Sequence, residues 1–330
     1  MESVMGGSRQ SCTASFPPDR YVCLLDELPL HLLPRATRKL LEQTADRPLV
    51  LNPECRLRRG DDLPDQFRAR QDLLSGFALQ GKIAWVRDPE DGTLLPFWLS
   101  GRLEALLREL SPNQRIHSSI PAPTISLLAQ AGILVPEQTS LRGSRRRSWK
   151  NLAAGFQEKS YAPLSSLIHP FHVAALRRYY RYQVRTGAIH LGDRQSARRY
   201  TAHNEPVARF FHHQLASTLS QVAGEALKPS YVYLASYLSG AELKKHTDRE
   251  QCDYSITVCV DYSPEPDLAT PWPIRLQTAE GTVSVYQGLG DGLAYRGTRV
   301  PHYRDKLGEG QTSTSIFFHY VREDFAGSLD

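Results

Sequence analysis

Long apolar runs are missing from this sequence of 330 residues, and no stretch approaches the roughly eighteen consecutive apolar residues of a membrane-spanning helix. We therefore expect no membrane partner. The first residues carry an early acid, Glu2, and lack the apolar core of a secretory signal. This predicts a disordered lead over residues 1–14.

Cysteine is scarce. The five cysteines are Cys12, Cys23, Cys55, Cys252 and Cys259. An odd number without any Cys-x-x-Cys spacing argues against a disulfide framework and against a zinc knuckle. A reducing compartment is the natural setting for such a chain, so we expect a cytoplasmic protein.

Net charge is also low, at +5, which is too small to predict nucleic-acid binding by itself. Five cations nevertheless gather between Arg142 and Lys150. Such a run suits phosphates, with Trp149 stacking on a base. Because it lacks apolar periodicity and falls where the composition changes, it favours the alternative, a solvated basic linker over residues 141–160.

Residues 15–140 contain apolar stripes at helical spacing and one hairpin pattern. The stripes lie in Leu30–Gln43 and Leu103–Leu110, and Thr124 is expected to cap a third helix. Gly81–Phe97 is typical of a β-hairpin. We expect a mostly helical accessory module, which loosely resembles the winged-helix-like modules that present peptide precursors to modifying enzymes. The alternative is a module that only buttresses the following domain.

His246-Thr247-Asp248, followed much later by His302, is the most informative pattern. Residues two apart on a strand point to the same side of a sheet, so His246 and Asp248 can hold one metal from one strand. His302 must then arrive from a neighbouring strand. Two imidazoles and one carboxylate on one face of an octahedron suit Fe(II) and leave the other positions open. These three residues are the predicted metal ligands.

The residues around the three ligands also form strand-like patterns with turns between them. Those that carry a family likeness are Tyr237–Gly240, Gln251–Tyr262, Gly290–Arg296, Pro301–Arg304 and Ser313–Tyr320. The pattern resembles the 2-oxoglutarate/Fe(II)-dependent dioxygenase superfamily, of the prolyl-hydroxylase-like kind. The resemblance implies Fe(II) and 2-oxoglutarate as cofactors, O₂ as a reactant, and His246, Asp248 and His302 as the catalytic centre.

The sequence departs from this family in the anchor for 2-oxoglutarate. Many members carry Arg or Lys about ten residues after the distal histidine, but residues 311–315 contain no cation. Arg304 is the first substitute, because it lies two residues after His302 and shares its face of the strand. Arg296 is the second candidate, and the Tyr237 hydroxyl is the third. The alternatives are a surface charge for either arginine and simple packing for the tyrosine.

The predicted fold is α+β. Residues 161–330 are expected to form a double-stranded β-helix, a jelly-roll or cupin-like barrel, with flanking helices at Pro170–Val184 and Pro206–Ala223. The polar loop Tyr200–Glu205 precedes the second helix. The family resemblance implies a loop that could reach over the metal and contact substrate, and the alternative is that Asn204 caps the helix.

The predicted activity is hydroxylation of an unactivated C–H bond in a peptide, an amino-acid side chain or a small natural product. The alternatives are a catalytically silent cupin-like binding module and a nucleic-acid demethylase of the same fold. The weak positive charge makes nucleic acid the less expected partner.

Overall fold

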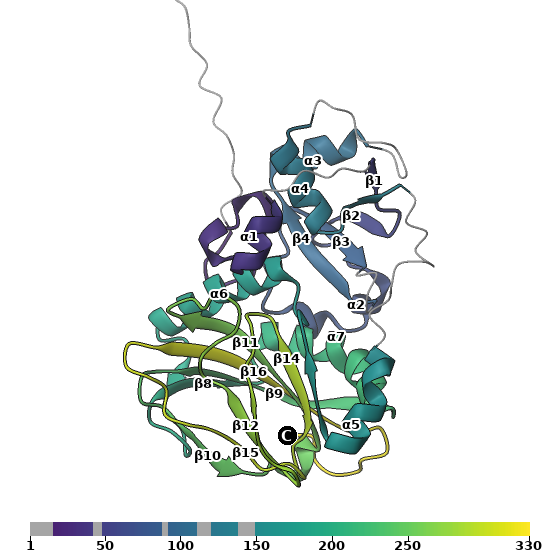
Figure 1. Ribbon diagram of the computed structural model, residues 1–330. Coiled ribbons are helices and arrows are strands. Elements are labelled where there is room, and N and C mark those ends of the chain that lie inside the picture. Colours follow the sequence, from purple (N-terminus) through teal and green to yellow (C-terminus); the bar gives the residue numbers. More distant parts are fainter. Residues whose placement is uncertain (1–15, 42–47, 88–91, 111–119, 138–148) are drawn as a thin grey trace, which may run out of the picture.

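The computed structural model describes residues 16–41, 48–87, 92–110, 120–137 and 149–330, and its C-terminal half is built on two antiparallel sheets (Figure 1). The seven-stranded sheet has the order β6-β14-β11-β16-β9-β8-β7, and the four-stranded sheet has the order β10-β15-β12-β13. The strands are β6 Tyr161–Leu164, β7 His190–Leu191, β8 Arg199–His203, β9 Leu227–Tyr237, β10 Leu243–His246, β11 Tyr254–Ser263, β12 Ile274–Thr278, β13 Gly281–Val285, β14 Gly292–Arg296, β15 His302–Arg304 and β16 Thr312–Arg322.

The seven-stranded sheet is covered on both faces. Strand β11 is buried along almost its whole length, as expected for a central strand of a sheet that has other elements packed on both of its faces. On one face, Tyr237 and Phe317 pack with Trp272, which lies just before strand β12 of the four-stranded sheet. On the same side, Leu276 of β12 packs with Tyr295 of β14. The inner faces of the two sheets therefore enclose apolar clusters between them.

Helices cover the other face. They are α5 Ala153–Lys159, α6 Pro170–Arg185 and α7 Pro206–Ala223. The two long flanking helices are confirmed to within a residue of their predicted ends. The predicted cap of α7 is wrong: Glu205 accepts hydrogen bonds from the backbone N–H groups of Val207 and Ala208. Asn204 instead takes a left-handed φ of 51° and turns the chain into the helix.

The N-terminal part is a mixture of helices and strands rather than mostly helical. Its elements are α1 Arg35–Leu41, β1 Leu49–Leu51, β2 Cys55–Arg59, α2 Asp65–Arg68, β3 Lys82–Arg87, β4 Leu94–Leu99, α3 Gly101–Arg108, α4 Ala122–Gln130 and β5 Leu134–Pro136, with single 3₁₀ turns at Leu25–Glu27, Leu30–Leu32 and Gln71–Leu74. Strands β2, β3 and β4 form one sheet, and β1 pairs with β5. Three- and five-residue strands are too short to show an alternating pattern, so the sequence did not reveal β1 or β2.

Two local predictions in this part have opposite outcomes. The hairpin is confirmed, because β3 pairs antiparallel with β4 from Lys82↔Leu99 to Arg87↔Leu94. The Thr124 cap is wrong: α4 starts at Ala122, and Thr124 is buried inside it. Pro123 fixes the backbone of the first turn, so the helix starts without a side-chain cap.

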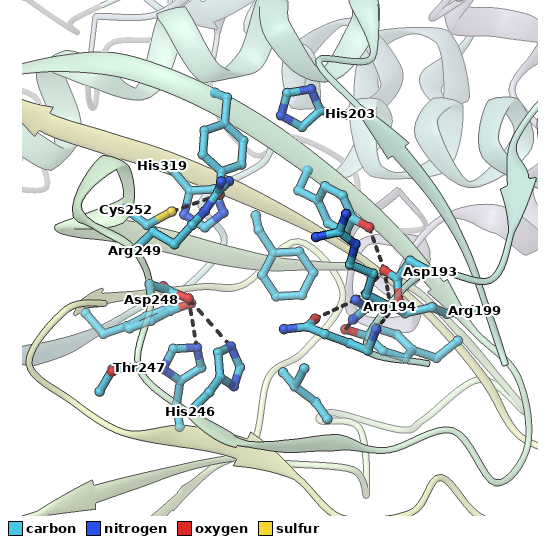
Figure 2. Close-up of a pocket in the computed structure, with 18 residues that line it drawn as sticks. Asp193, Arg194, Arg199, His203, His246, Thr247, Asp248, Arg249, Cys252 and His319 are labelled. Carbon is cyan, nitrogen blue, oxygen red and sulfur yellow. Dashed lines mark hydrogen bonds and ion pairs between the residues drawn. The ribbon is translucent and has the colours of Figure 1, made fainter. Parts of the chain in front are cut away.

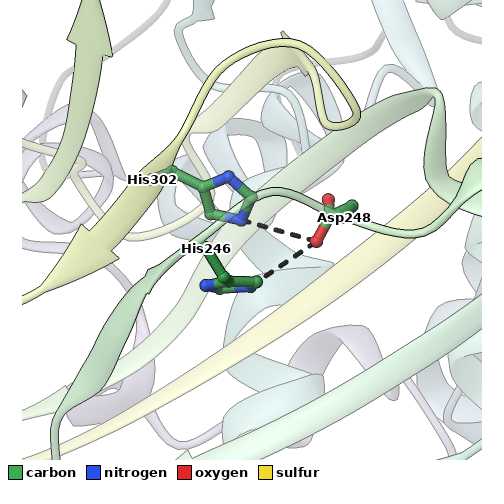
Figure 3. Close-up of side chains that lie close together, drawn as sticks. All are labelled: His246, Asp248 and His302. Atoms are coloured by element: carbon green, nitrogen blue, oxygen red, sulfur yellow. Dashed lines mark ion pairs between the residues drawn. The ribbon is translucent and has the colours of Figure 1, made fainter.

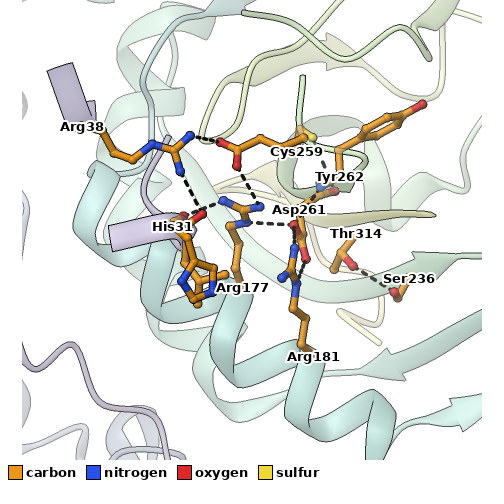
Figure 4. A network of polar contacts seen from close by, with 11 residues as sticks. His31, Arg38, Arg177, Arg181, Ser236, Cys259, Asp261, Tyr262 and Thr314 are labelled. Atoms are coloured by element: carbon orange, nitrogen blue, oxygen red, sulfur yellow. Dashed lines mark hydrogen bonds and ion pairs between the residues drawn. The ribbon is translucent and has the colours of Figure 1, made fainter. Parts of the chain in front are cut away.

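A buried ion network joins the two parts of the chain (Figure 4). Arg177 of α6 donates to Asp261 of β11 at 2.8 Å and to the carbonyl of Leu32 at 2.6 Å. Arg181 adds a second, bidentate contact to Asp261, at 2.6 and 2.9 Å. The N-terminal part thus lies against the helix-covered face, away from the four-stranded sheet.

Some predictions fall on segments that lack a described structure. The lead at 1–14 and residues 141–148 of the basic linker lie outside the described residues. The rest of that linker is structured, because Trp149–Leu152 is a 3₁₀ turn and α5 packs against α7. No described helix is long and apolar enough to cross a membrane.

Candidate metal centre

The three predicted ligands meet where β10 pairs with β15 (Figure 3). His246, the last residue of β10, lies directly opposite His302, the first residue of β15. Nε2 of His246 is 3.6 Å and Nε2 of His302 is 3.5 Å from the same oxygen of Asp248, Oδ1. All three donor atoms lie within 4.8 Å of one another, which lets a single ion touch all of them.

Asp248 reaches this position from a turn and not from the strand itself. Strand β10 ends at His246, and the backbone N–H of Asp248 bonds to the carbonyl of Gly297 at 2.9 Å. The expectation that His246 and Asp248 share one strand is therefore wrong in detail. The chain leaves β10 and is held against the Gly297 loop instead, and this contact still directs both side chains to one point.

The outer nitrogens of both histidines are held by backbone carbonyls. Nδ1 of His246 lies 2.8 Å from the oxygen of Lys244, and Nδ1 of His302 lies 3.0 Å from the oxygen of Val300. A carbonyl only accepts, so each Nδ1 carries the proton and each Nε2 presents a lone pair. Hydrogen bonds of this kind fix the orientation of metal-binding imidazoles.

The charge states also suit a metal. Burial raises the pKa of Asp248, but the nearby rings of His246 and His302 bring it below its ordinary value, so the carboxylate is ionised. Burial lowers the pKa of His302, so its ring is neutral near pH 7. The adjacent Asp248 carboxylate raises the pKa of His246, so a metal competes with a proton for Nε2 of that ring. An anionic carboxylate with two imidazoles is a donor set that Fe(II) accepts.

Two residues that were not predicted from the sequence lie against Oδ2 of Asp248, the carboxylate oxygen that faces away from the two histidines. A Cβ atom at Gly297 would lie 2.4 Å from Oδ2 of Asp248, so only glycine permits this close approach. The hydroxyl of Ser255 donates to the same oxygen at 3.3 Å and lies 2.8 Å from Nδ1 of His319. A glycine and a serine in ordinary loop and strand contexts give no sequence signal of such a role.

The three ligands line a cavity of about 420 Å³ between the two sheets (Figure 2). Its far wall carries Arg199, which donates to Asp193 at 2.9 Å and to the Tyr237 hydroxyl at 3.3 Å. Tyr233 also donates to Asp193, at 2.6 Å. Burial raises the pKa of Asp193, but the bonds from Arg199 and Tyr233 hold it below its ordinary value. Asp193 and Arg199 therefore neutralise each other, and neither was expected from the sequence.

Arg304 is buried on the same face of β15 as His302, as its position two residues later predicts. Its guanidinium donates to the carbonyl of Trp272 at 2.8 Å and to Oε1 of Gln287 at 3.1 Å, and it lies 4.7 Å from the Trp272 ring centre. Its Nε atom has no hydrogen-bond partner, and no carboxylate pairs with it in the described parts of the chain. Burial lowers its pKa. A buried cation without an anion is costly unless a ligand supplies one.

The other two anchor candidates have different surroundings. Tyr237 lines the cavity, as proposed from the sequence. Arg296 does not: it follows Tyr295, which faces the cavity, so it projects from the opposite face of β14. There it pairs with Asp253 at 3.2 Å and lies 4.0 Å from the centre of the Tyr254 ring. This corrects the prediction that Arg296 contacts the co-substrate.

No protein-family model and no curated protein matches this sequence. Among solved structures, the chain is similar to a prolyl 4-hydroxylase from Pseudomonas putida, with 15% identity, a TM-score of 0.44, and coverage of 53% of this chain and 99% of the other. It is similar to the non-haem α-ketoglutarate-dependent epimerase SnoN from nogalamycin biosynthesis, with 12% identity, a TM-score of 0.45, and coverage of 53% and 82%. It is also similar to HygX from Streptomyces hygroscopicus, solved with nickel, 2-oxoglutarate and hygromycin B, with 12% identity, a TM-score of 0.41, and coverage of 53% and 88%.

These solved structures belong to the 2-oxoglutarate/Fe(II) oxygenases, the family that the sequence resembles. Because the identities are 15% or less and these TM-scores lie below 0.5, the function proposed below rests on the geometry of the site.

Proposed function

We propose that this chain is a non-haem Fe(II)- and 2-oxoglutarate-dependent dioxygenase, and that its two sheets form the double-stranded β-helix of that class. The observation that carries the proposal is the meeting of His246, Asp248 and His302. Their donor atoms converge from one side, both outer histidine nitrogens are fixed by carbonyls, and the open side faces the cavity. A closed structural metal site would leave no such open side.

Iron bound by these residues would supply O₂ activation coupled to the oxidative decarboxylation of 2-oxoglutarate, and through it the oxidation of a substrate C–H bond. The protein's own part is positional. His246 and His302 present neutral lone pairs, and Asp248 supplies the single negative charge. Gly297 and Ser255 fix the direction of that carboxylate.

Arg304 is the proposed partner of the far carboxylate of 2-oxoglutarate. Two residues along a strand are about 6.6 Å apart, which is comparable to the length of a five-carbon dicarboxylate. A co-substrate bound by one end to an ion beside His302 therefore has about the length needed to approach Arg304 with its other end. The free Nε atom and the missing counter-charge are what this carboxylate would satisfy. Tyr237 and Arg199 are the secondary candidates, and both are among the residues that line the cavity, whereas Arg304 lies behind that lining.

The proposed substrate is a small molecule or a single side chain of a peptide, because a cavity of about 420 Å³ is of the size that holds one such group. The proposed reaction is hydroxylation of an unactivated C–H bond. O₂ is the other reactant, and aromatic residues form part of the cavity wall, among them Tyr233, Tyr237 and Phe317.

Iron content after anaerobic loading tests this assignment. The wild type should retain one Fe(II) per chain after gel filtration, and His246→Ala, Asp248→Ala and His302→Ala should each lose it with unchanged circular dichroism. His190→Ala is the matched control, because that histidine is exposed on the short strand β7 outside the cavity. Stoichiometric iron in His302→Ala would remove the assignment. Iron binding without any conversion of 2-oxoglutarate would point to a silent binding module.

A further inference from the structure

A second set of metal-binding side chains adjoins the triad and shares one of its residues. Cys252 lies in the 3₁₀ turn Glu250–Cys252, and His319 lies in β16. One donor atom from each, together with one from Asp248, lies within 4.8 Å of the others. Figure 2 shows Cys252 and His319 on the cavity wall beside Asp248. Both added side chains are buried, so this is not a chance gathering of surface groups.

His319 is held in the manner of a metal-binding histidine. Its Nδ1 lies 2.8 Å from the hydroxyl of Ser255, and the ring packs against Tyr231 with centroids 4.7 Å apart. Within the described residues, no hydrogen bond occupies its Nε2, although the residue lines the cavity. One nitrogen is therefore fixed and the other is available, the same division that both triad histidines show.

The sulfur of Cys252 lies beside a hydroxyl group and a nearby guanidinium. The Tyr231 hydroxyl lies 3.0 Å from Sγ, and Arg249 donates to that hydroxyl at 3.0 Å. A guanidinium only donates, so the tyrosine oxygen accepts that bond and its own proton is free to point at the sulfur. Burial and then the nearby Asp248 carboxylate raise the pKa of the Cys252 thiol to about 12, and the Tyr231 hydroxyl and Arg249 oppose this rise, so the metal itself must displace the thiol proton.

We propose that Asp248, Cys252 and His319 form a second, softer metal position that takes a thiophilic divalent ion such as Zn²⁺. The two oxygens of Asp248 face different ways, because Oδ1 faces the triad histidines and Oδ2 lies next to Ser255. One carboxylate can thus serve both positions. Donor atoms around a four-coordinate zinc lie about 3.3–3.8 Å apart, so the three groups must close by about 1 Å.

When the metal binds, it takes the place of the thiol proton of Cys252, and that proton is released to solvent. Water from the cavity completes the coordination. The consequence rests on the proposed oxygenase function: an ion at this position shares the Asp248 carboxylate with iron, which weakens the contact between that carboxylate and the iron. Zinc would then inhibit through Cys252, and not only by replacing iron at His246 and His302.

Cobalt titration of the metal-free full-length protein tests the site itself. Co²⁺ bound by a thiolate gives a near-ultraviolet charge-transfer band that a site of imidazoles and carboxylates lacks. The wild type should bind two Co²⁺ per chain and show the band. Cys252→Ser should bind one and lose the band, and His302→Ala should keep the band. Cys259→Ser is the matched control, because Cys259 is equally buried but belongs to no group of metal-binding residues in the described chain.

One equivalent of Co²⁺ without the band in the wild type would overturn the proposal, whether or not the variants fold. A band that persists in Cys252→Ser would overturn it too, and His319→Gln provides a second variant whose expected loss of the band checks the same point. This measurement needs no 2-oxoglutarate, so it stands apart from the oxygenase proposal. In succinate assays, Cys252→Ser should raise the zinc concentration for half-inhibition by at least roughly tenfold. An unchanged value would refute the inhibitory role.

Discussion

The guanidinium of Arg304 allows a test in which co-substrate affinity and stability respond differently. Arg304→Met removes the charge and keeps most of the volume. Trp272 and Gln287 lose a donor, which costs about 1–3 kcal/mol for each buried acceptor. In the wild type, a desolvated guanidinium without a carboxylate destabilises the folded state by several kcal/mol. The Arg304→Met variant lacks the guanidinium and so avoids this cost. The two effects nearly cancel, so the free energy of unfolding should stay within about 2 kcal/mol of the wild type.

The affinity for 2-oxoglutarate should fall sharply in the same variant. Losing a charge-assisted bidentate pair costs roughly 2–4 kcal/mol, or about 30- to 1000-fold in Kd. Arg304→Lys should recover part of this, because it restores the charge without the planar fork. Calorimetry with Mn²⁺-loaded protein measures the affinity without turnover, and urea unfolding of the metal-free protein measures the stability.

Arg177→Met is the matched control, since Arg177 is just as buried but pairs with Asp261. It should leave the affinity unchanged and lower the stability by about 3 kcal/mol, because a buried carboxylate loses one partner. Wild-type affinity in Arg304→Met would refute the anchor and shift attention to Arg199 and Tyr237.

Two further predictions concern the groups around the ligands, and a third concerns His212, which is buried in α7. Gly297→Ala should weaken iron binding by at least roughly tenfold, because its Cβ would displace the Asp248 carboxylate; metal titration checks this. Ser255→Ala should weaken it by about 10- to 100-fold, and equal affinities would show that the hydroxyl does not orient the ligand. Burial lowers the pKa of His212 to about 3, so between that value and 6.5 the unfolded state binds the extra proton. Stability is then complete above about pH 6.5 and falls below it, by about 2 kcal/mol at pH 5. His212→Gln should remove that part of the difference between urea unfolding at pH 8 and pH 5.

The three metal ligands could be predicted because their residue types and the short spacing of His246 and Asp248 are visible in the sequence. Histidine and aspartate at a spacing of two, a distant histidine and the strand-like runs around them together indicate a metal site, and the structure brings the three residues together. The inward direction of Arg304 followed from the alternation of side chains along β15. Arg296 failed for a related reason: its face depended on the register of β14, and the sequence did not show which of Tyr295 and Arg296 points inward.

The missed residues act through contacts between distant segments. Arg199 donates to the Tyr237 hydroxyl on the neighbouring strand and to Asp193, and Gly297 matters only because the loop that carries Asp248 packs on it. The burial of Arg177 is similarly invisible in a helix whose outer face carries many cations. Such roles arise from long-range pairing, for which a single sequence has no periodic signal.

The oxygenase assignment is decided by the conversion of 2-oxoglutarate to succinate by the iron-loaded wild type, measured together with O₂ consumption. We expect succinate to form in proportion to the O₂ consumed, omission of Fe(II) to abolish its formation, and His302→Ala to reduce it to background. Wild-type protein that holds one Fe(II) per chain but forms no succinate above that background would show that the chain is not a 2-oxoglutarate-dependent oxygenase.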